Sequence, residues 1–126
     1  MSDKLTVLVA DDSPTVNRLI SYMLEKEGYR VISVSDGKTA LDKALNEPLD
    51  AVLLDIMMPR LDGMQVLKKI KDEKPRLPVI ILTAENKDKD IKNALDLGAN
   101  DYITKPFETA AVAEKLKQVL EEKNDH

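Results

Sequence analysis

The sequence contains no cysteine, no tryptophan and a single histidine among its 126 residues. The absence of cysteine rules out disulfide bonds and thiolate metal sites, and it argues against a secreted scaffold held together by disulfides. The one histidine, His126, is the final residue of the sequence, and we interpret it as part of a tail. Histidine-based catalysis within this chain is therefore not expected.

Long apolar segments and clustered basic charge are missing as well. The opening residues MSDKLTVLVA have neither the basic start nor the apolar length of a signal peptide. No apolar run approaches the roughly 18 residues of a membrane span. Nineteen basic residues stand against 23 acidic ones, for a net charge of −4, whereas binding to phosphate backbones requires clustered lysine and arginine. We therefore expect a cytoplasmic protein that binds neither membranes nor nucleic acid directly.

Two small lysine clusters do occur, and acidic residues are interspersed in both. The first comprises Lys68, Lys69 and Lys71, and the second comprises Lys87, Lys89 and Lys92. Mixed charge at helical spacing is typical of solvated helix faces. We interpret both clusters in this way, with a surface for a protein partner as the alternative.

Short apolar runs alternate with helical patterns along the chain. The expected strands are residues 5–10, 31–34, 51–54, 79–82 and 102–104. Ser13-Pro14 is typical of a helix start, and Gly28 and Gly98 are typical of helix ends. The pattern predicts an α/β fold of five βα units, with a parallel sheet covered by helices on both faces. We expect one domain over residues 1–126, with a core of about 4–122 and a short charged C-terminal tail.

The polarity of the strands predicts their order in the sheet. Residues 7–9, 52–54 and 79–82 are continuously apolar, as central parallel strands are, because both of their faces are buried. Residues 30–35 and 101–104 are more polar, as edge strands are. The doubly wound, flavodoxin-like order 2-1-3-4-5 places the polar strands at the edges, whereas the order 3-2-1-4-5 would bury the second strand. The first order is therefore predicted.

Polar residues follow four of these strands. Asp11 and Asp12 follow the first strand, Asp55 the third, Thr83 the fourth and Lys105 the fifth. In such sheets ligands bind beyond the carboxyl ends of the strands, at the point where the strand order reverses. Three carboxylates at that point repel one another unless a cation lies among them.

This combination of residues predicts a specific chemistry. Carboxylate-rich oxygen sites suit Mg²⁺, with Mn²⁺ as a possible substitute, and do not suit zinc. A carboxylate nucleophile, a divalent cation, a lysine and a hydroxyl are together the groups needed for phosphoryl transfer onto an aspartate. Asp55, at the tip of a central strand, is the expected acceptor.

Four motifs resemble those of response-regulator receiver domains in two-component signal transduction. They are Val-Ala-Asp-Asp at 9–12, Leu-Asp-Ile-Met-Met-Pro-Arg-Leu-Asp-Gly at 54–63, Leu-Thr-Ala at 82–84 and Tyr-Ile-Thr-Lys-Pro-Phe at 102–107. Their order is that of the family, and the resemblance extends over nearly the whole chain. It implies that Asp55 is the phosphoacceptor, that Asp12 binds the metal directly, and that Asp11 binds it often through water. Met57 would contribute its backbone carbonyl to the metal.

The resemblance also implies roles for residues on the last two strands. Thr83 and Lys105 would contact the phosphoryl group. Tyr102 would turn inward when Thr83 moves toward the phosphoryl group. The peptide between Lys105 and Pro106 would be cis. The face formed by the fourth helix, fifth strand and fifth helix would then change on phosphorylation.

Two side chains are expected to tune the loss of the phosphoryl group. The resemblance places Met57 and Glu85 beside the path of the attacking water, and we expect Met57 to shield it. The expected partners are a sensor histidine kinase or phosphotransfer protein and a downstream protein target. The chain would be a monomer, or a weak dimer on phosphorylation, and either a stand-alone receiver or part of a longer regulator. We do not expect a turnover enzyme.

Three other functions compete with this interpretation. Carboxylate-nucleophile phosphatases carry an Asp-x-Asp pattern in which the second aspartate acts as acid and base, but residues 55–57 lack that second acid. A flavin binder needs a neutral loop after the first strand, where Asp11 and Asp12 would repel phosphate, and only 3% of the residues are aromatic. A receiver kept only as a scaffold would be expected to have lost part of the site, yet all five polar residues are present.

Overall fold

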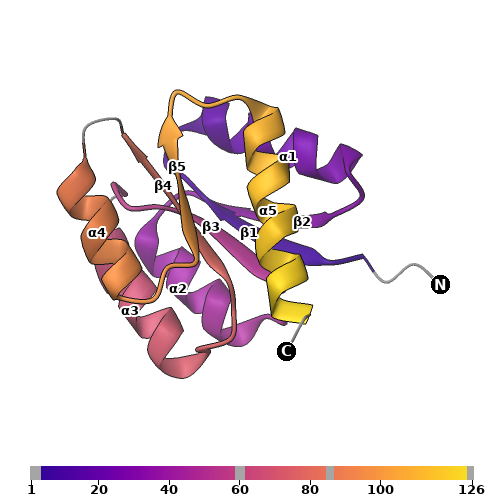
Figure 1. Ribbon diagram of the computed structural model, residues 1–126. Coiled ribbons are helices and arrows are strands. Elements are labelled where there is room, and N and C mark those ends of the chain that lie inside the picture. The colour runs from indigo at the N-terminus through magenta and orange to yellow at the C-terminus, as the bar shows by residue number, and fades with distance from the viewer. Residues whose placement is uncertain (1–3, 59–61, 85–86, 125–126) are drawn as a thin grey trace.

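The computed structural model describes residues 4–58, 62–84 and 87–124, and within them the chain forms a five-stranded parallel sheet with helices on both faces (Figure 1). The strands are β1 (Thr6–Ala10), β2 (Arg30–Val34), β3 (Ala51–Asp55), β4 (Val79–Ala84) and β5 (Asp101–Lys105). The helices are α1 (Pro14–Lys26), α2 (Gly37–Asn46), α3 (Gly63–Glu73), α4 (Asp88–Asp96) and α5 (Thr109–Asn124). Several strands begin or end one or two residues away from the predicted limits.

The strand order is β2-β1-β3-β4-β5, as predicted. All five residues of β3 are buried, and so are most of those in β1 and β4, while β2 and β5 are largely half-buried or exposed. The contrast in polarity thus reflects the position of each strand in the sheet. The order reverses between β1 and β3, which pair directly with each other.

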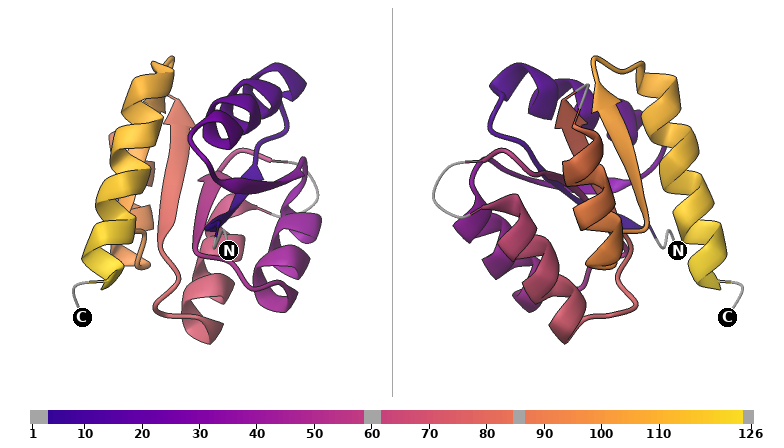
Figure 2. Two further views of the ribbon diagram at one scale, coloured as in Figure 1. Left: turned by 90° about the vertical axis from the view of Figure 1, so that its right-hand side faces the viewer. Right: turned by 60° about the vertical axis from the view of Figure 1, so that its left-hand side comes forward.

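Two apolar layers hold the helices against the sheet (Figure 2). On one face, α1 and α5 contribute buried side chains such as Ile20, Leu24 and Leu116. On the other face, α2, α3 and α4 contribute side chains such as Ala40 and Leu67. Within the described ranges, none of the helices is both long enough and apolar enough to span a bilayer.

The predicted helix ends are confirmed. The Ser13 hydroxyl accepts a hydrogen bond from the Val16 amide at 3.3 Å, directly before Pro14 in the first turn of α1. Gly28 and Gly98 follow the C-caps of α1 and α4 with φ angles of 95° and 110°. Those angles lie in the left-handed region, where only glycine avoids a steric penalty.

Lys71 departs from the predicted solvated helix face. Its side chain is half-buried, and its Nζ donates to the Leu77 carbonyl at 2.7 Å and to Asn100 Oδ1 at 2.8 Å. Burial lowers the pKa of Lys71 below its usual value. This lysine therefore ties α3 to the segments that precede β4 and β5, whereas Lys68 on the same helix remains exposed.

Candidate functional site

Three carboxylates meet where the strand order reverses. Asp11 and Asp12 follow β1, and Asp55 is the last residue of β3. Each offers a carboxylate oxygen, and these oxygens all lie within 4.8 Å of one another. Asp11 and Asp55 are buried and Asp12 is exposed, so the cluster opens to solvent on one side. The predicted convergence is confirmed.

Lys105 neutralises part of this negative charge. Its Nζ lies 2.8 Å from Asp11 Oδ2 and 3.0 Å from Asp55 Oδ2. Lys105 ends β5, two strands away from β3, and its long side chain crosses the carboxyl edge of β4 to reach the acids. Three carboxylates and one ammonium leave an excess of negative charge in a largely buried place.

Backbone groups fix the orientation of the two buried acids. The Met57 amide donates to Asp55 Oδ1 at 2.9 Å, and the Ser13 amide donates to Asp11 Oδ1 at 2.9 Å. Gly63, at the start of α3, packs so closely on Ile56 that any side chain there would collide with the backbone. The loop after β3 is thus held close to the end of its own strand.

The electrostatics agree with the geometry. Burial raises the pKa of Asp55, and the charge of Asp11 adds to this effect, while the Met57 amide and Lys105 oppose it. Burial alone would lower the pKa of Lys105, but its contacts with Asp11 and Asp55 more than offset this and raise it. The fold therefore disfavours the charged form of Asp55 and favours the charged form of Lys105. An oxygen-only donor set with excess negative charge fits Mg²⁺.

The hydroxyl of Thr83 is buried and forms no hydrogen bond within the described ranges. The residue lies in β4, is 1% exposed, and its Oγ1 has no hydrogen-bond partner among the described residues. Burying a hydroxyl without a partner costs about 1–3 kcal/mol, so such groups are rare in folded proteins. A group bound beside Asp55 would supply the missing acceptor.

The other predicted features within the described ranges are the Lys105–Pro106 peptide, Tyr102 and Met57. The Lys105–Pro106 peptide is cis, as predicted. Tyr102 in β5 is 37% exposed, and Lys115 Nζ lies 5.8 Å from its ring centroid. The Met57 residue is 64% exposed beside the carboxylates. Glu85 and His126 lie outside the described residues.

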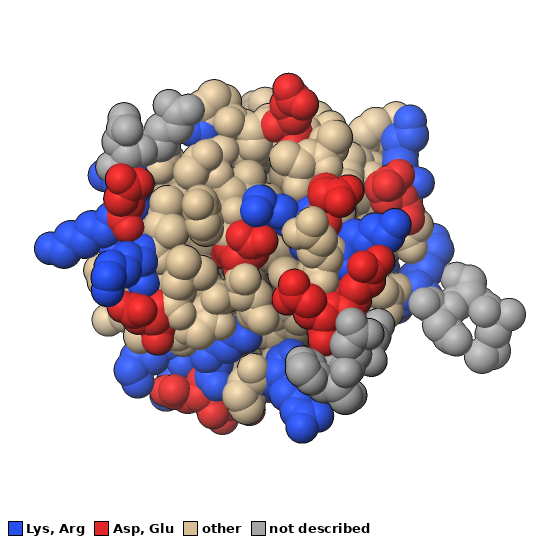
Figure 3. All heavy atoms as spheres, in the orientation of Figure 1, with Lys and Arg blue, Asp and Glu red and all other residues tan. Residues whose placement is uncertain are grey.

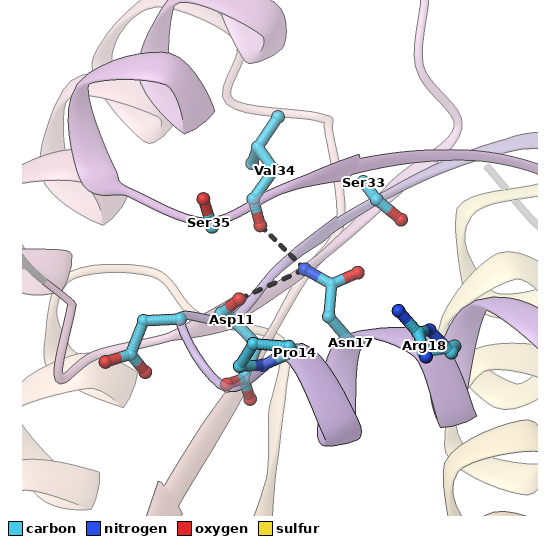
Figure 4. A pocket seen from close by; sticks show the side chains of 8 residues that line it. Asp11, Pro14, Asn17, Arg18, Ser33, Val34 and Ser35 are labelled. Carbon is cyan, nitrogen blue, oxygen red and sulfur yellow. Dashed lines mark hydrogen bonds between the residues drawn. The ribbon is translucent and has the colours of Figure 1, made fainter.

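A cleft of about 470 Å³ lies next to the carboxylates (Figure 4). It is lined by Asp11, Asp12, Pro14, Asn17, Arg18, Ser33, Val34 and Ser35. The sequence patterns did not indicate Asn17, whose amide reaches toward Asp11 and Val34 inside this cleft. The available signal was its place in the predicted helix, one residue after the apolar Val16 and three before the apolar Ile20.

Comparison with known proteins gives a consistent result. A family model described as the response regulator receiver domain matches residues 7–117. The alkaline phosphatase synthesis transcriptional regulatory protein PhoP of Bacillus subtilis is 43% identical over 114 residues, which are 90% of this chain and 48% of that protein. Response regulator GtcR of Aneurinibacillus migulanus is 43% identical over 115 residues, 91% of this chain and 47% of that protein. The chain thus spans about half the length of these relatives.

Solved structures share the whole fold. A CheY-like response regulator receiver domain protein from Methanospirillum hungatei has a TM-score of 0.93 at 28% identity, with 98% of each chain covered. The receiver domain of sensor histidine kinase PA1611 from Pseudomonas aeruginosa has a TM-score of 0.85 at 35% identity, with 93% of this chain and 98% of that one covered. That structure holds a magnesium ion coordinated in the active site cleft.

Proposed function

The chain belongs to the response-regulator receiver domain family of two-component signal transduction, and we propose that Asp55 is the residue that accepts its phosphoryl group. Asp55 is the only one of the three clustered acids that lies within a central strand, as its last residue, and it contacts Lys105 directly, as Asp11 also does. In the transfer, an Asp55 carboxylate oxygen forms a bond to phosphorus. The bond from phosphorus to the donor breaks, and its electron pair leaves with the donor atom.

Asp11, Asp12 and Asp55, with the backbone carbonyl of Met57, are the proposed residues that hold Mg²⁺. When bound, the ion supplies positive charge for the phosphoryl oxygens. Mn²⁺ is proposed as a substitute because it takes the same oxygen donors. The backbone amides of Ser13 and Met57 donate hydrogen bonds to the carboxylates of Asp11 and Asp55 and so fix their orientation.

Lys105 and Thr83 are proposed to bind the phosphoryl oxygens. Lys105 already lies 3.0 Å from Asp55, so its ammonium can shift from that carboxylate to a phosphoryl oxygen that carries more charge. The Thr83 hydroxyl lacks a partner among the residues described, and movement toward the phosphoryl group would supply one. Tyr102, partly exposed in the neighbouring strand, is proposed to turn inward as Thr83 moves.

One observation carries this proposal: a buried aspartate, a lysine paired with it and a hydroxyl without a partner in the described ranges meet at one edge of the sheet. The test is incubation with Mg²⁺ and acetyl phosphate, followed by intact-mass measurement. The wild type should gain one phosphoryl group and Asp55→Asn should gain none. Asp50→Asn, which changes an aspartate at the opposite end of β3, is the control and should label as the wild type does. Equal labelling of Asp55→Asn would refute the assignment.

The acceptor role sets the proposed partners. A histidine kinase or phosphotransfer protein would donate the phosphoryl group, and a protein target would read the face formed by α4, β5 and α5. Figure 3 shows acidic and basic side chains interspersed over the visible face, without a continuous basic patch for nucleic acid. The chain would act in the cytoplasm, as a monomer or as a weak dimer on phosphorylation, and within either a stand-alone receiver or a longer regulator.

Loss of the phosphoryl group would be self-catalysed and slower than with a polar residue at position 57, without turnover of external phosphate esters. Met57 is exposed beside Asp55, where its thioether can exclude water but cannot orient it strongly. Glu85 is proposed to affect the same step, with an effect of either sign. A phosphatase is not favoured, because the position of its second acid is occupied by Met57.

A further inference from the structure

Asn17 ties the loop that carries two proposed metal ligands to the end of a neighbouring strand. Its Nδ2 donates to the backbone carbonyl of Asp11 at 3.0 Å and to that of Val34 at 2.8 Å (Figure 4). Asn17 belongs to the first half of α1, Asp11 directly follows β1, and Val34 is the last residue of β2. One amide group therefore joins three elements at the edge of the carboxylate cluster.

These hydrogen bonds fix a particular peptide unit. The pairing of β1 with β2 ends at Ala10 and Val34, and only the Asp11 amide continues it, donating to the Val34 carbonyl at 3.2 Å. The Asp11 carbonyl instead accepts from Asn17. That carbonyl belongs to the planar peptide that joins Asp11 to Asp12, so holding it sets the direction in which the chain enters Asp12.

The two acids depend on this peptide to different degrees. The Asp11 carboxylate is also held by the Ser13 amide and by Lys105. For the Asp12 carboxylate, which is exposed, the described part of the chain provides no hydrogen bond or ion pair. Among the described residues, only the main chain that Asn17 holds therefore fixes the position from which Asp12 reaches toward Asp11 and Asp55.

We propose that Asn17 is a positioning residue for the divalent cation, acting through the Asp11–Asp12 peptide without touching the ion. This inference rests on the proposed metal site. Groups that orient metal ligands typically change metal affinity by about 10- to 100-fold when they are removed. We therefore expect Asn17→Ala to weaken Mg²⁺ binding by about that factor.

The experiment is an Mg²⁺ titration of the wild type and of each variant. The amide NMR shifts of residues 11–13 and 55–57 report metal binding at each Mg²⁺ concentration. Ile20→Val is the first control, because Ile20 is fully buried in the same helix and the change loosens its packing without touching the amide. Asn46→Ala is the second control, because Asn46 also donates two hydrogen bonds through Nδ2 but lies at the end of α2. Both controls should keep the wild-type affinity. An Asn17→Ala protein that binds Mg²⁺ as tightly as the wild type overturns the proposal.

A measurement on the wild type decides the question if Asn17→Ala does not fold. If the amide hydrogen bonds strengthen metal binding, metal binding must strengthen them equally. Solvent exchange of the Asn17 Nδ2 protons should then slow as Mg²⁺ is added, with the same midpoint as the amide shifts. Unchanged exchange at saturating Mg²⁺ overturns the proposal.

Failure of the metal site itself gives a different result. A wild-type protein that shows no saturable Mg²⁺ binding overturns the site, and the role of Asn17 with it. So does an Asp12→Asn protein that keeps the wild-type affinity. A role for Asn17 alone is refuted when Asp12→Asn loses binding and Asn17→Ala does not.

Discussion

Replacing Thr83 by valine should stabilise the unphosphorylated protein, which is the reverse of what most buried substitutions do. Valine has nearly the shape of threonine and exchanges the hydroxyl for a methyl group. The Thr83 hydroxyl is buried and has no hydrogen-bond partner in the described ranges, so it carries a desolvation cost of about 1–3 kcal/mol. Removing that cost should raise the free energy of unfolding by about 1–2 kcal/mol after allowance for small repacking strain.

The assay is thermal and urea denaturation without a phosphodonor and with the metal chelated. For a domain of this size the gain corresponds to a rise in Tm of about 3–8 °C. Thr104→Val is the matched control, since Thr104 lies opposite Thr83 in the β4–β5 register but is only half-buried. The stability of that variant should stay within about 0.5 kcal/mol of the wild type.

The same substitution should cost stability once a phosphoryl mimic is bound. With Mg²⁺ and beryllofluoride on Asp55, the wild-type hydroxyl gains a charge-assisted hydrogen bond of about 1.5–3 kcal/mol, which valine cannot form. The stabilisation caused by the mimic should therefore be smaller in Thr83→Val. If Thr83→Val is no more stable than the wild type when unphosphorylated, the hydroxyl is already satisfied and the reasoning is wrong.

Three further predictions concern the metal, the half-buried Lys71 and the lifetime of the signal. Mg²⁺ at 100 times its Kd should stabilise the wild type by about 2.7 kcal/mol, and Asp12→Asn should lose most of this gain in thermal denaturation; an equal gain would refute direct binding. Lys71→Met should lower the free energy of unfolding by about 1–3 kcal/mol at pH 7, because the Leu77 carbonyl loses its Lys71 donor and Asn100 Oδ1 keeps only the Val79 amide, while exposed Lys68→Met should change it little. The pKa of Lys71 is lower in the folded protein than its usual value near 10.5, so between these two pH values the unfolded chain binds more protons than the folded one. In that pH range Lys71 therefore makes the free energy of unfolding rise with pH. Urea denaturation at several pH values should show that Lys71→Met removes this rise. Met57→Asn should shorten the lifetime of the phosphorylated protein at fixed Mg²⁺, and equal decay rates would show that the Met57 side chain does not shield Asp55.

Local patterns in the sequence were sufficient to predict most of the fold. The alternation of apolar runs with helical spacing, the Ser13 cap and the glycines at 28 and 98 act over a few residues, and each is confirmed. The contrast between apolar and polar strands predicted the order of the sheet, because a strand that is buried on both faces consists almost entirely of apolar residues. That order, with the rule that ligands bind beyond the strand ends, is enough to predict that Asp11, Asp12 and Asp55 lie together.

Other features depended on contacts between residues far apart in the chain. Asn17 reaches a carbonyl 17 positions away, and Lys71 reaches a side chain 29 positions away. In the sequence Asn17 is an ordinary polar residue on a helix, and Lys71 belongs to a charged run. Thr83 Oγ1 has no partner in residues 4–58, 62–84 and 87–124, and this too depends on all of its neighbours at once. Hydrogen bonds are satisfied or left open by the packing of whole elements, so only the tertiary structure decided which of these polar groups have partners among the described residues.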